Sequence, residues 1–194
     1  MSGAGFLLDL HRCVGCGACV LACRIENGRV EAAPWRRVLP LNLRRHPAGP
    51  TYFLSVACHH CERPACLRGC PSGAYEKRAD GIVVHHEDRC LGCRYCEMAC
   101  PFGAPRYDAD RGVMSKCHLC APRVDEGRNP ACVAACPTEA LRMRRPDSDE
   151  ARPTAALVPG FADPAGCGPS IRFAPPAGTR RAALFTSIEE ALKR

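Results

Sequence analysis

The feature that most constrains this chain is the arrangement of its cysteines. Sixteen of its 17 cysteines fall into four groups of four. The first and third groups share the spacing C-x2-C-x2-C-x3-C, the second is C-x2-C-x4-C-x3-C and the fourth is C-x2-C-x11-C-x3-C. The groups are Cys13, Cys16, Cys19 and Cys23; Cys58, Cys61, Cys66 and Cys70; Cys90, Cys93, Cys96 and Cys100; and Cys117, Cys120, Cys132 and Cys136. Only Cys167 lies outside them.

This spacing is typical of iron–sulfur ligation. Three thiolates on a C-x2-C-x2-C loop can wrap one face of a cubane, and in bacterial ferredoxins the fourth cysteine ligates the other cluster of a pair. Three groups end in Cys-Pro, at Pro71, Pro101 and Pro137. Proline fixes φ and lacks a backbone N–H, so it turns the chain away after the last ligand. An alanine also lies four residues after each of those cysteines.

Zinc and disulfides are the rival interpretations. Zinc sites join two C-x2-C pairs across a longer span, without a third cysteine two residues further on. Disulfides between C-x2-C neighbours would close small, strained rings. Residues 1–10 have no basic region, and Asp9 interrupts their apolar run, so we expect no secretion signal. A zinc-binding interaction module stays open as the alternative from a different class.

Composition excludes further classes. The chain is 46% hydrophobic and 24% charged, which excludes a disordered protein. Its apolar runs are far shorter than the roughly 20 residues of a membrane span. No Ser-His-Asp set, paired-carboxylate site or Walker loop is visible, so we expect no catalytic site of its own. Five histidines lie near the cysteine groups, but each group already has four thiols, so we expect none as a ligand. These are His59, His60, His85, His86 and His118.

Charge raises the question of nucleic acid. The formal net charge is +7, and 24 of the 27 basic residues are arginines. The arginines are scattered and no helix-turn-helix is present, so we expect no nucleic-acid partner. Four oxidised clusters with their thiolates would add roughly −8, which brings the loaded protein to about −1. The basic excess therefore indicates a counter-charge for buried clusters, together with docking surface.

At this point the chain resembles a known family. The resemblance rests on CVGCGAC at 13–19, CHHCERPAC at 58–66, CPSGA at 70–74, ADGIVV at 79–84, CLGCRYCEMACPFGAP at 90–105, KC at 116–117, PAC at 130–132 and PSIRF at 169–173. It is similar to the four-cluster ferredoxin-type subunit of the complex iron–sulfur molybdoenzymes, and most of all to that of dimethyl sulfoxide reductases. The resemblance covers about residues 6 to 176.

The resemblance implies how the groups pair. The first group pairs with the fourth, and the second with the third. The implied ligand sets are Cys13, Cys16, Cys19 and Cys136; Cys117, Cys120, Cys132 and Cys23; Cys58, Cys61, Cys66 and Cys100; and Cys90, Cys93, Cys96 and Cys70. Some relatives lack a third-group cysteine and hold a three-iron cluster. Cys93 fills that place here, so four [4Fe–4S] clusters are expected.

The expected fold is α+β, with two bacterial-ferredoxin-like modules of short strands, short helices and cluster-binding loops. The first module takes residues 1–50 with 105–145, the second takes 51–104, and 146–194 forms an extended, partner-contacting tail. The sequence predicts strands at residues 6–9 and 52–56, helical turns at 20–26, and a hairpin at 74–85 around Asp80-Gly81. Ser187 and Glu190 suggest a capping box that opens a final helix.

The resemblance also implies a function. It predicts an electron-transfer subunit that connects a membrane quinone-reactive subunit to a molybdopterin catalytic subunit, in a dimethyl-sulfoxide-reductase-type terminal reductase of anaerobic respiration. The runner-up is the equivalent subunit of a formate dehydrogenase, a hydrogenase or a polysulfide, thiosulfate or tetrathionate reductase. We expect membrane association through partners, on the periplasmic face by co-export, with the cytoplasmic face or the cytoplasm as alternatives.

Overall fold

The computed structural model describes residues 3–29, 33–41, 43, 51–145, 158, 161, 163 and 166–174. Its strands are β1 (Gly5–Asp9), β2 (Arg37–Leu41), β3 (Tyr52–Val56), β4 (Tyr75–Lys77), β5 (Val83–His85), β6 (Arg106–Asp108), β7 (Val113–Ser115), β8 (Leu141–Arg144) and β9 (Arg172–Ala174). Its helices are α1 (Ala18–Glu26), α2 (Ala65–Arg68), α3 (Tyr95–Ala99), α4 (Ala121–Asp125) and α5 (Ala131–Ala134), with a 3₁₀ turn, η1, at Glu87–Arg89.

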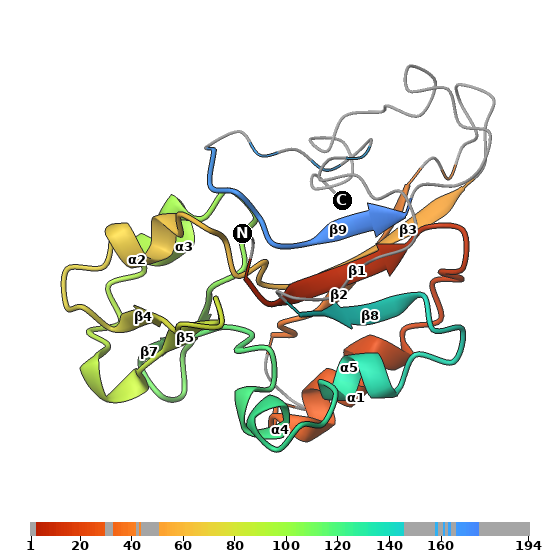
Figure 1. Ribbon diagram of the computed structural model, residues 1–194. Coiled ribbons are helices and arrows are strands. Elements are labelled where there is room, and N and C mark those ends of the chain that lie inside the picture. The colour runs from red at the N-terminus through yellow and green to blue at the C-terminus, as the bar shows by residue number, and fades with distance from the viewer. Residues whose placement is uncertain are drawn as a thin grey trace.

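One region of the molecule is built on a three-stranded sheet with the order β8-β1-β9. β1 pairs antiparallel with β8 and parallel with β9, so Leu8 lies between Leu141 and Phe173. Helices α1 and α5 lie together beneath this sheet (Figure 1). All five residues of β1 are buried, because neighbours cover both of its faces. We call this part, with the β2–β3 hairpin, the sheet region.

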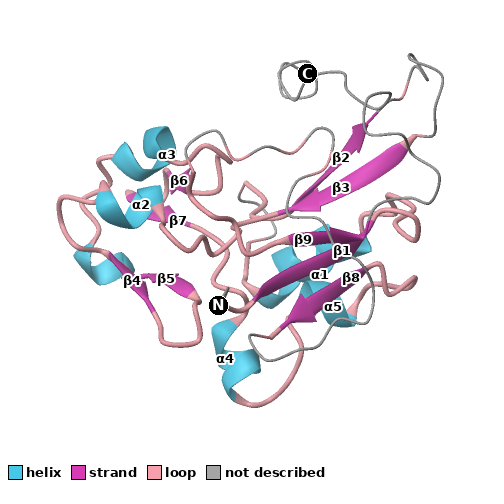
Figure 2. Ribbon diagram, turned by 45° about the horizontal axis from the view of Figure 1, so that its top comes forward, coloured by secondary structure: helices cyan, strands magenta, loops and turns pink. Residues whose placement is uncertain are grey.

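A second region carries no sheet larger than a hairpin within the described residues. β4 pairs with β5 and β6 with β7, each antiparallel, and the short helices α2 and α3 pack beside them (Figure 2). Its buried cluster is small: Cys66, Tyr75, Val83, Cys96 and Met114. We call this part the hairpin region.

A strap from the C-terminal part of the chain joins the two regions. Glu62 and Arg63 donate backbone N–H bonds to the carbonyls of Gly168 and Cys167, at 2.7 and 2.9 Å. Ser170 donates its backbone N–H to the His59 carbonyl at 2.9 Å. The same segment then enters the sheet as β9. Residues 166–174 of the expected tail thus form a strap across the chain's own second cysteine loop. That the tail contacts a partner stays a prediction.

Several expected elements are confirmed. Strands at 6–9 and 52–56 and the hairpin at 74–85 are present, and the helix expected from residue 20 begins at Ala18. The mixed α+β class is confirmed. The division into two modules stays a prediction; the β6–β7 hairpin contributes Met114 to the core of the hairpin region. The final helix expected after Ser187 lies outside the described residues. None of the described helices has the length and apolar character needed to cross a membrane.

Candidate iron–sulfur sites

Two cavities in the molecule are each lined by four cysteines predicted to bind one cluster. The larger holds about 360 Å³ of space outside protein atoms, part of it open to solvent, and Cys58, Cys61, Cys66 and Cys100 line it. Three of these come from the loop of the second group, and Cys100 is the last cysteine of the third. The structure therefore brings together the two groups that the resemblance pairs.

The other cavity repeats this arrangement in the sheet region. It holds about 330 Å³ of such space, again partly open to solvent, and Cys13, Cys16, Cys19 and Cys136 line it. Three cysteines again come from one loop, and the fourth precedes a proline in a distant group. The two cavities have nearly the same size, and in each the donors are three cysteines of one loop and one cysteine of a distant group. Both therefore fit the same kind of cofactor.

These donor sets fit an iron–sulfur cubane better than a zinc ion. Four thiolates around one zinc lie at Zn–S distances of about 2.3 Å, so their sulfurs nearly touch. Within the described part of the chain, no three Cys, His, Asp or Glu side chains converge closely enough to hold a single ion. Four sulfurs spaced around a cavity instead match a guest that carries its own iron and sulfide atoms.

All four cysteine loops turn in the same way. The residue just before the second cysteine has positive φ in every group: Gly15 at 72°, His60 at 45°, Gly92 at 64° and Leu119 at 57°. This left-handed conformation is costly for residues with a side chain, so His60 and Leu119 are held there by their surroundings. A shared turn in all four groups supports a shared ligating role.

Backbone amides point at the cysteine sulfurs from two directions. Within the loops, Gly92 and Leu119 donate N–H groups to the sulfurs of Cys90 and Cys117, each at 3.4 Å. Beyond two of the Cys-Pro pairs, Ala74 donates to Cys70 Sγ at 3.3 Å and Ala104 donates to Cys100 Sγ at 3.5 Å. Such donors stabilise charge on sulfur and adjust cluster potentials.

The third Cys-Pro pair departs slightly from that pattern. Cys136 Sγ accepts from the N–H of Leu141 at 3.4 Å, five residues on. Burial opposes ionisation of Cys70 and Cys136. The Ser72 hydroxyl and nearby backbone amides at Cys70, and the Leu141 amide and Thr138 hydroxyl at Cys136, nevertheless hold the pKa of both thiols below their ordinary value. The alanine spacing seen in the sequence therefore marks the donors to two of the three sulfurs.

The more deeply buried cysteines show the opposite shift, a raised pKa. Burial, reinforced by nearby sulfurs, raises the pKa of Cys23 and of Cys66 to about 12. Burial also raises the pKa of Cys117 well above its ordinary value. These thiols are protonated at neutral pH unless a cation compensates them, so cluster binding and folding are coupled.

The two remaining predicted ligand sets are also drawn together. Cys23 lies near Cys120 and Cys132 in the sheet region, and Cys117 neighbours Cys23 and Cys132. In the hairpin region, Cys70 and Cys90 pack against the buried cluster that contains Cys96. Cys93, the fourth member of that set, is exposed, as is Cys16 of the first set.

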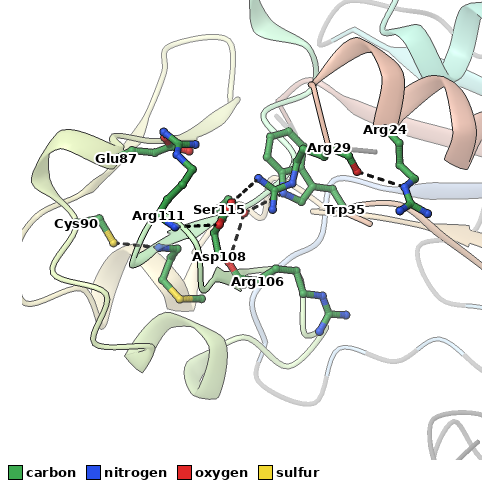
Figure 3. A network of polar contacts seen from close by, with 10 residues as sticks. Arg24, Arg29, Trp35, Glu87, Cys90, Arg106, Asp108, Arg111 and Ser115 are labelled. Atoms are coloured by element: carbon green, nitrogen blue, oxygen red, sulfur yellow. Dashed lines mark hydrogen bonds and ion pairs between the residues drawn. The ribbon is translucent and has the colours of Figure 1, made fainter. Parts of the chain in front are cut away.

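A buried polar network fixes the hairpin region to the sheet region. Arg29 donates to Asp108 Oδ2 at 3.2 Å, with side chains only 7% and 10% exposed. Arg29 also lies over the ring of Trp35, whose Nε1 donates to Ser115 Oγ at 3.1 Å. Figure 3 shows the network reaching the sulfur of Cys90, which accepts the N–H of Met114 at 3.4 Å.

Sequence reasoning left Cys167 without a role, and the structure places it in the wall of the larger cavity. Its side chain is 0% exposed, and it joins Cys58, Cys61, Cys66 and Cys100 around that space. Asp163 Oδ1 accepts its backbone N–H at 2.8 Å. No spacing signal links Cys167 to a group more than thirty residues away, so only the folded strap reveals it.

Two histidines of the second cysteine loop, His59 and His60, lie where burial lowers their pKa. His59 lines the same cavity and packs edge-on against Phe102 and Phe161, with ring centroids 4.7 and 4.9 Å away. Burial lowers its pKa to about 3. His60 Nδ1 accepts the backbone N–H of Val83 at 3.0 Å. Both rings thus support the second cysteine loop through packing and hydrogen bonding.

Comparison with known proteins identifies the kind of cofactor. A family model described as a 4Fe-4S dicluster domain matches residues 50–145. It spans the whole of the second, third and fourth groups. The expected [4Fe–4S] cofactors are thereby confirmed.

Relatives match over most of the chain. One of the chains of the anaerobic dimethyl sulfoxide reductase of Escherichia coli is 47% identical over 145 residues, covering 71% of each protein. The thiosulfate reductase electron transfer subunit of Salmonella typhi is 40% identical over 147 residues, 74% of this chain and 77% of the relative. One of the subunits of the sulfite dehydrogenase of Allochromatium vinosum is 37% identical over 174 residues, 77% and 72% of the two proteins. The protein therefore belongs to the family of 4Fe–4S electron-transfer subunits that includes those of anaerobic dimethyl sulfoxide reductases.

Proposed function

We propose that the chain carries single electrons along four [4Fe–4S] clusters, as the electron-transfer subunit of a dimethyl-sulfoxide-reductase-type molybdoenzyme. The observation that carries the proposal is the pair of cavities, each lined by three cysteines of one loop and the Cys-Pro cysteine of another. The clusters accept and return electrons when bound. The chain's own residues hold them, donate N–H groups to their ligands and keep water out.

The sixteen cysteines divide into four proposed ligand sets. Site one takes Cys13, Cys16, Cys19 and Cys136; site two takes Cys23, Cys117, Cys120 and Cys132; site three takes Cys58, Cys61, Cys66 and Cys100; and site four takes Cys70, Cys90, Cys93 and Cys96. The cavities support sites one and three directly. The mutual proximity of the other cysteines supports sites two and four.

Neighbouring sulfurs support an order for the proposed sites. Cys19 of site one neighbours Cys132 of site two. Cys117 of site two shares a buried cluster with Cys58 of site three. Cys66 of site three lies beside Cys96 of site four. These contacts support a path that runs from site one to site four through the interior.

Both ends of this path reach the surface beside exposed apolar side chains. Cys16 is exposed at site one, next to the exposed Val14. Cys93 is exposed at site four, where Leu91 and Met98 are 72% and 74% exposed. Exposed apolar side chains beside an electron entry point are typical of a surface that binds a partner. We place the molybdopterin catalytic subunit at site one and a quinone-reactive membrane anchor at site four.

The layout of the chain follows from these sites. Residues 1–50 with 105–145 form the first proposed module, 51–104 form the second, and 146–194 form the tail that contacts a partner. The strap at 166–174 covers the loop of site three. We place the assembled complex on the periplasmic face of the membrane, with co-export by a signal-bearing partner.

The decisive experiment replaces one ligand at the proposed membrane end. Cys93→Ser should convert or remove the cluster of site four, with loss of its electron paramagnetic resonance signal. Quinol-driven turnover of the complex should stop, while turnover of the catalytic subunit with an artificial donor continues. Cys167→Ser serves as a comparison, because this thiol lies in the wall of the site-three cavity and outside the sixteen ligands, so the signal of site four should persist in it. Unimpaired quinol-driven turnover in Cys93→Ser would contradict the proposal.

A second candidate function comes from the sulfite dehydrogenase relative, whose name indicates an oxidation. In that case electrons would enter from the catalytic partner at site one and leave at site four. Co-purification identifies the catalytic partner, and the reaction of that partner separates the two directions. A partner that only oxidises its substrate would replace the reductase assignment and leave the ligand sets unchanged.

A further inference from the structure

Arg36 is a fully buried cation to which the proposed electron path assigns no role. The residue immediately precedes β2, and it is 1% exposed. Its Nη1 donates to Ser55 Oγ at 2.9 Å and to the Ser55 carbonyl at 3.3 Å. The guanidinium lies over the ring of Phe6, 4.3 Å from its centroid. These contacts fix the position of the charge.

No carboxylate compensates this charge among the described residues. Its Nε and Nη2 are buried and have no hydrogen-bond partner in the described part of the chain. A buried charge without an opposite charge is strongly destabilising. Arginine also keeps its proton inside proteins, so the site cannot become neutral by losing it. The surroundings must therefore supply an anion when the protein is loaded.

The groups that face Arg36 are cysteine sulfurs. Burial alone would lower the pKa of the guanidinium, but Cys132, Cys117, Cys19 and Cys23 together raise it. Three of these belong to site two, and Cys19 belongs to site one. Cys19 Sγ also lies 3.3 Å from Ser55 Oγ, the hydroxyl that accepts from Arg36. The charge thus lies between two proposed ligand sets: the guanidinium hydrogen-bonds to Cys132 of site two and reaches Cys19 of site one through Ser55.

We propose that Arg36 is a positioning residue that raises the reduction potential of site two, and to a smaller extent that of site one. The inference rests on the ligand sets proposed above. Reduction adds one electron to a [4Fe–4S]²⁺ core and gives [4Fe–4S]⁺, so the site gains one negative charge. A fixed positive charge in a low-dielectric interior stabilises that reduced form. Because Arg36 holds its proton throughout, the electron arrives without proton uptake at this residue.

The experiment is a potentiometric titration of the full-length holoprotein, followed by electron paramagnetic resonance. Arg36→Gln removes the charge and keeps a donor for Ser55, whereas Arg36→Lys keeps the charge. Arg37→Gln is the matched control: it removes an equal charge from the next residue, whose neighbouring ligand is Cys100 of site three. The signal lost in Cys120→Ser assigns site two, and the one lost in Cys16→Ser assigns site one.

The expected result is a lower midpoint potential at site two in Arg36→Gln. The equilibrium constant for its reduction should fall about tenfold or more, and tenfold is 59 mV for a one-electron couple. The midpoint potential of site one should fall by less, and the potentials of sites three and four should not change. Arg36→Lys and Arg37→Gln should leave site two near its original potential. The shift should persist at high salt, because the charge is buried.

Two results would overturn the inference, and neither resembles failure of the proposed function. A fully loaded Arg36→Gln protein with four unchanged midpoint potentials would show that the charge of Arg36 does not affect the reduction of any cluster. If that variant does not assemble, Ser55→Ala replaces it: the guanidinium loses the hydroxyl that holds it in place, so the potentials of sites one and two should both fall, and no change at either site would also overturn the inference. A wild-type chain with far fewer than about 16 iron atoms would instead refute the ligand sets.

Discussion

The sheet region and the hairpin region hold cysteine sites of the same design in very different surroundings. The sheet region has an apolar core that includes Phe6, Leu8, Ile171 and Phe173, and three hydrogen-bonded strands run through it. The core of the hairpin region is a cluster of five residues, two of which are the cysteines Cys66 and Cys96. The sheet region can bury a large apolar area without its clusters, whereas the hairpin region has only Tyr75, Val83 and Met114 in its buried cluster besides ligands.

The difference shows how the two regions use metal. Small units with few apolar residues gain their folding free energy from metal–ligand bonds, which exist only in the folded state. The hairpin region should follow this rule closely. The sheet region should depend on metal mainly at its cysteine loops, because its strands also gain from hydrophobic burial.

The largest expected effect is therefore the removal of iron. Anaerobic chelation should abolish hydrogen-exchange protection at β4–β5 and β6–β7, while β1 and β8 keep measurable protection. Exchange followed by mass spectrometry reads the two regions separately in one sample. Because the whole chain contains four cluster sites, we expect the metal-free protein to be largely unfolded outside the central sheet. Equal loss of protection in both regions would remove the distinction.

The next effect concerns the contact between the regions. Asp108→Asn leaves the buried Arg29 without its carboxylate, and breaking a buried pair in this way costs about 3–5 kcal/mol. A shift of the guanidinium-chloride unfolding midpoint of the loaded protein measures the loss. Glu139→Gln is the control, since its ion pair with Arg12 is exposed and such pairs contribute roughly 0–1 kcal/mol. Equal midpoints for both variants would mean that the network does not hold the regions together.

A smaller effect should distinguish equivalent turns in the two regions. Gly15 and Gly92 both have positive φ, and alanine there costs about 1–2 kcal/mol of backbone strain. At Gly15 the new Cβ would meet the Phe53 ring at 2.6 Å, and a ring can rotate. At Gly92 it would collide with the carbonyl oxygen of Gly112, and backbone cannot move without breaking the turn.

Gly92→Ala should therefore lose the cluster of site four, and Gly15→Ala should keep that of site one at reduced stability. Iron content per chain and the spectroscopic signal of each site measure the outcome. Gly17→Ala separates strain from collision, because its φ is also positive but no atom lies within 4 Å of the added Cβ. If Gly92→Ala retained full iron, the two turns would be equally tolerant.

Much of the site could be predicted because its signals are local. The C-x2-C loops, the Cys-Pro ends and the short strands each depend on residues a few positions apart. The donors to two Cys-Pro sulfurs were visible as alanines at a fixed spacing, but the donor to Cys136 is Leu141, which no shared spacing marked. Helix α1 begins two residues earlier than expected, because the helix follows directly on the left-handed Gly17.

By itself the sequence determined the number of cysteine groups, the chemistry of their donors and the family they resemble, because ligand identity and spacing are properties of the chain. The tertiary structure decided which groups share a cavity, that the strap brings Cys167 to one cavity wall, and that Arg36 lies between two ligand sets. Those features join residues far apart in the chain, and burial creates the charge balance that makes them matter. No local pattern encodes how desolvated a guanidinium will be or which sulfurs will face it.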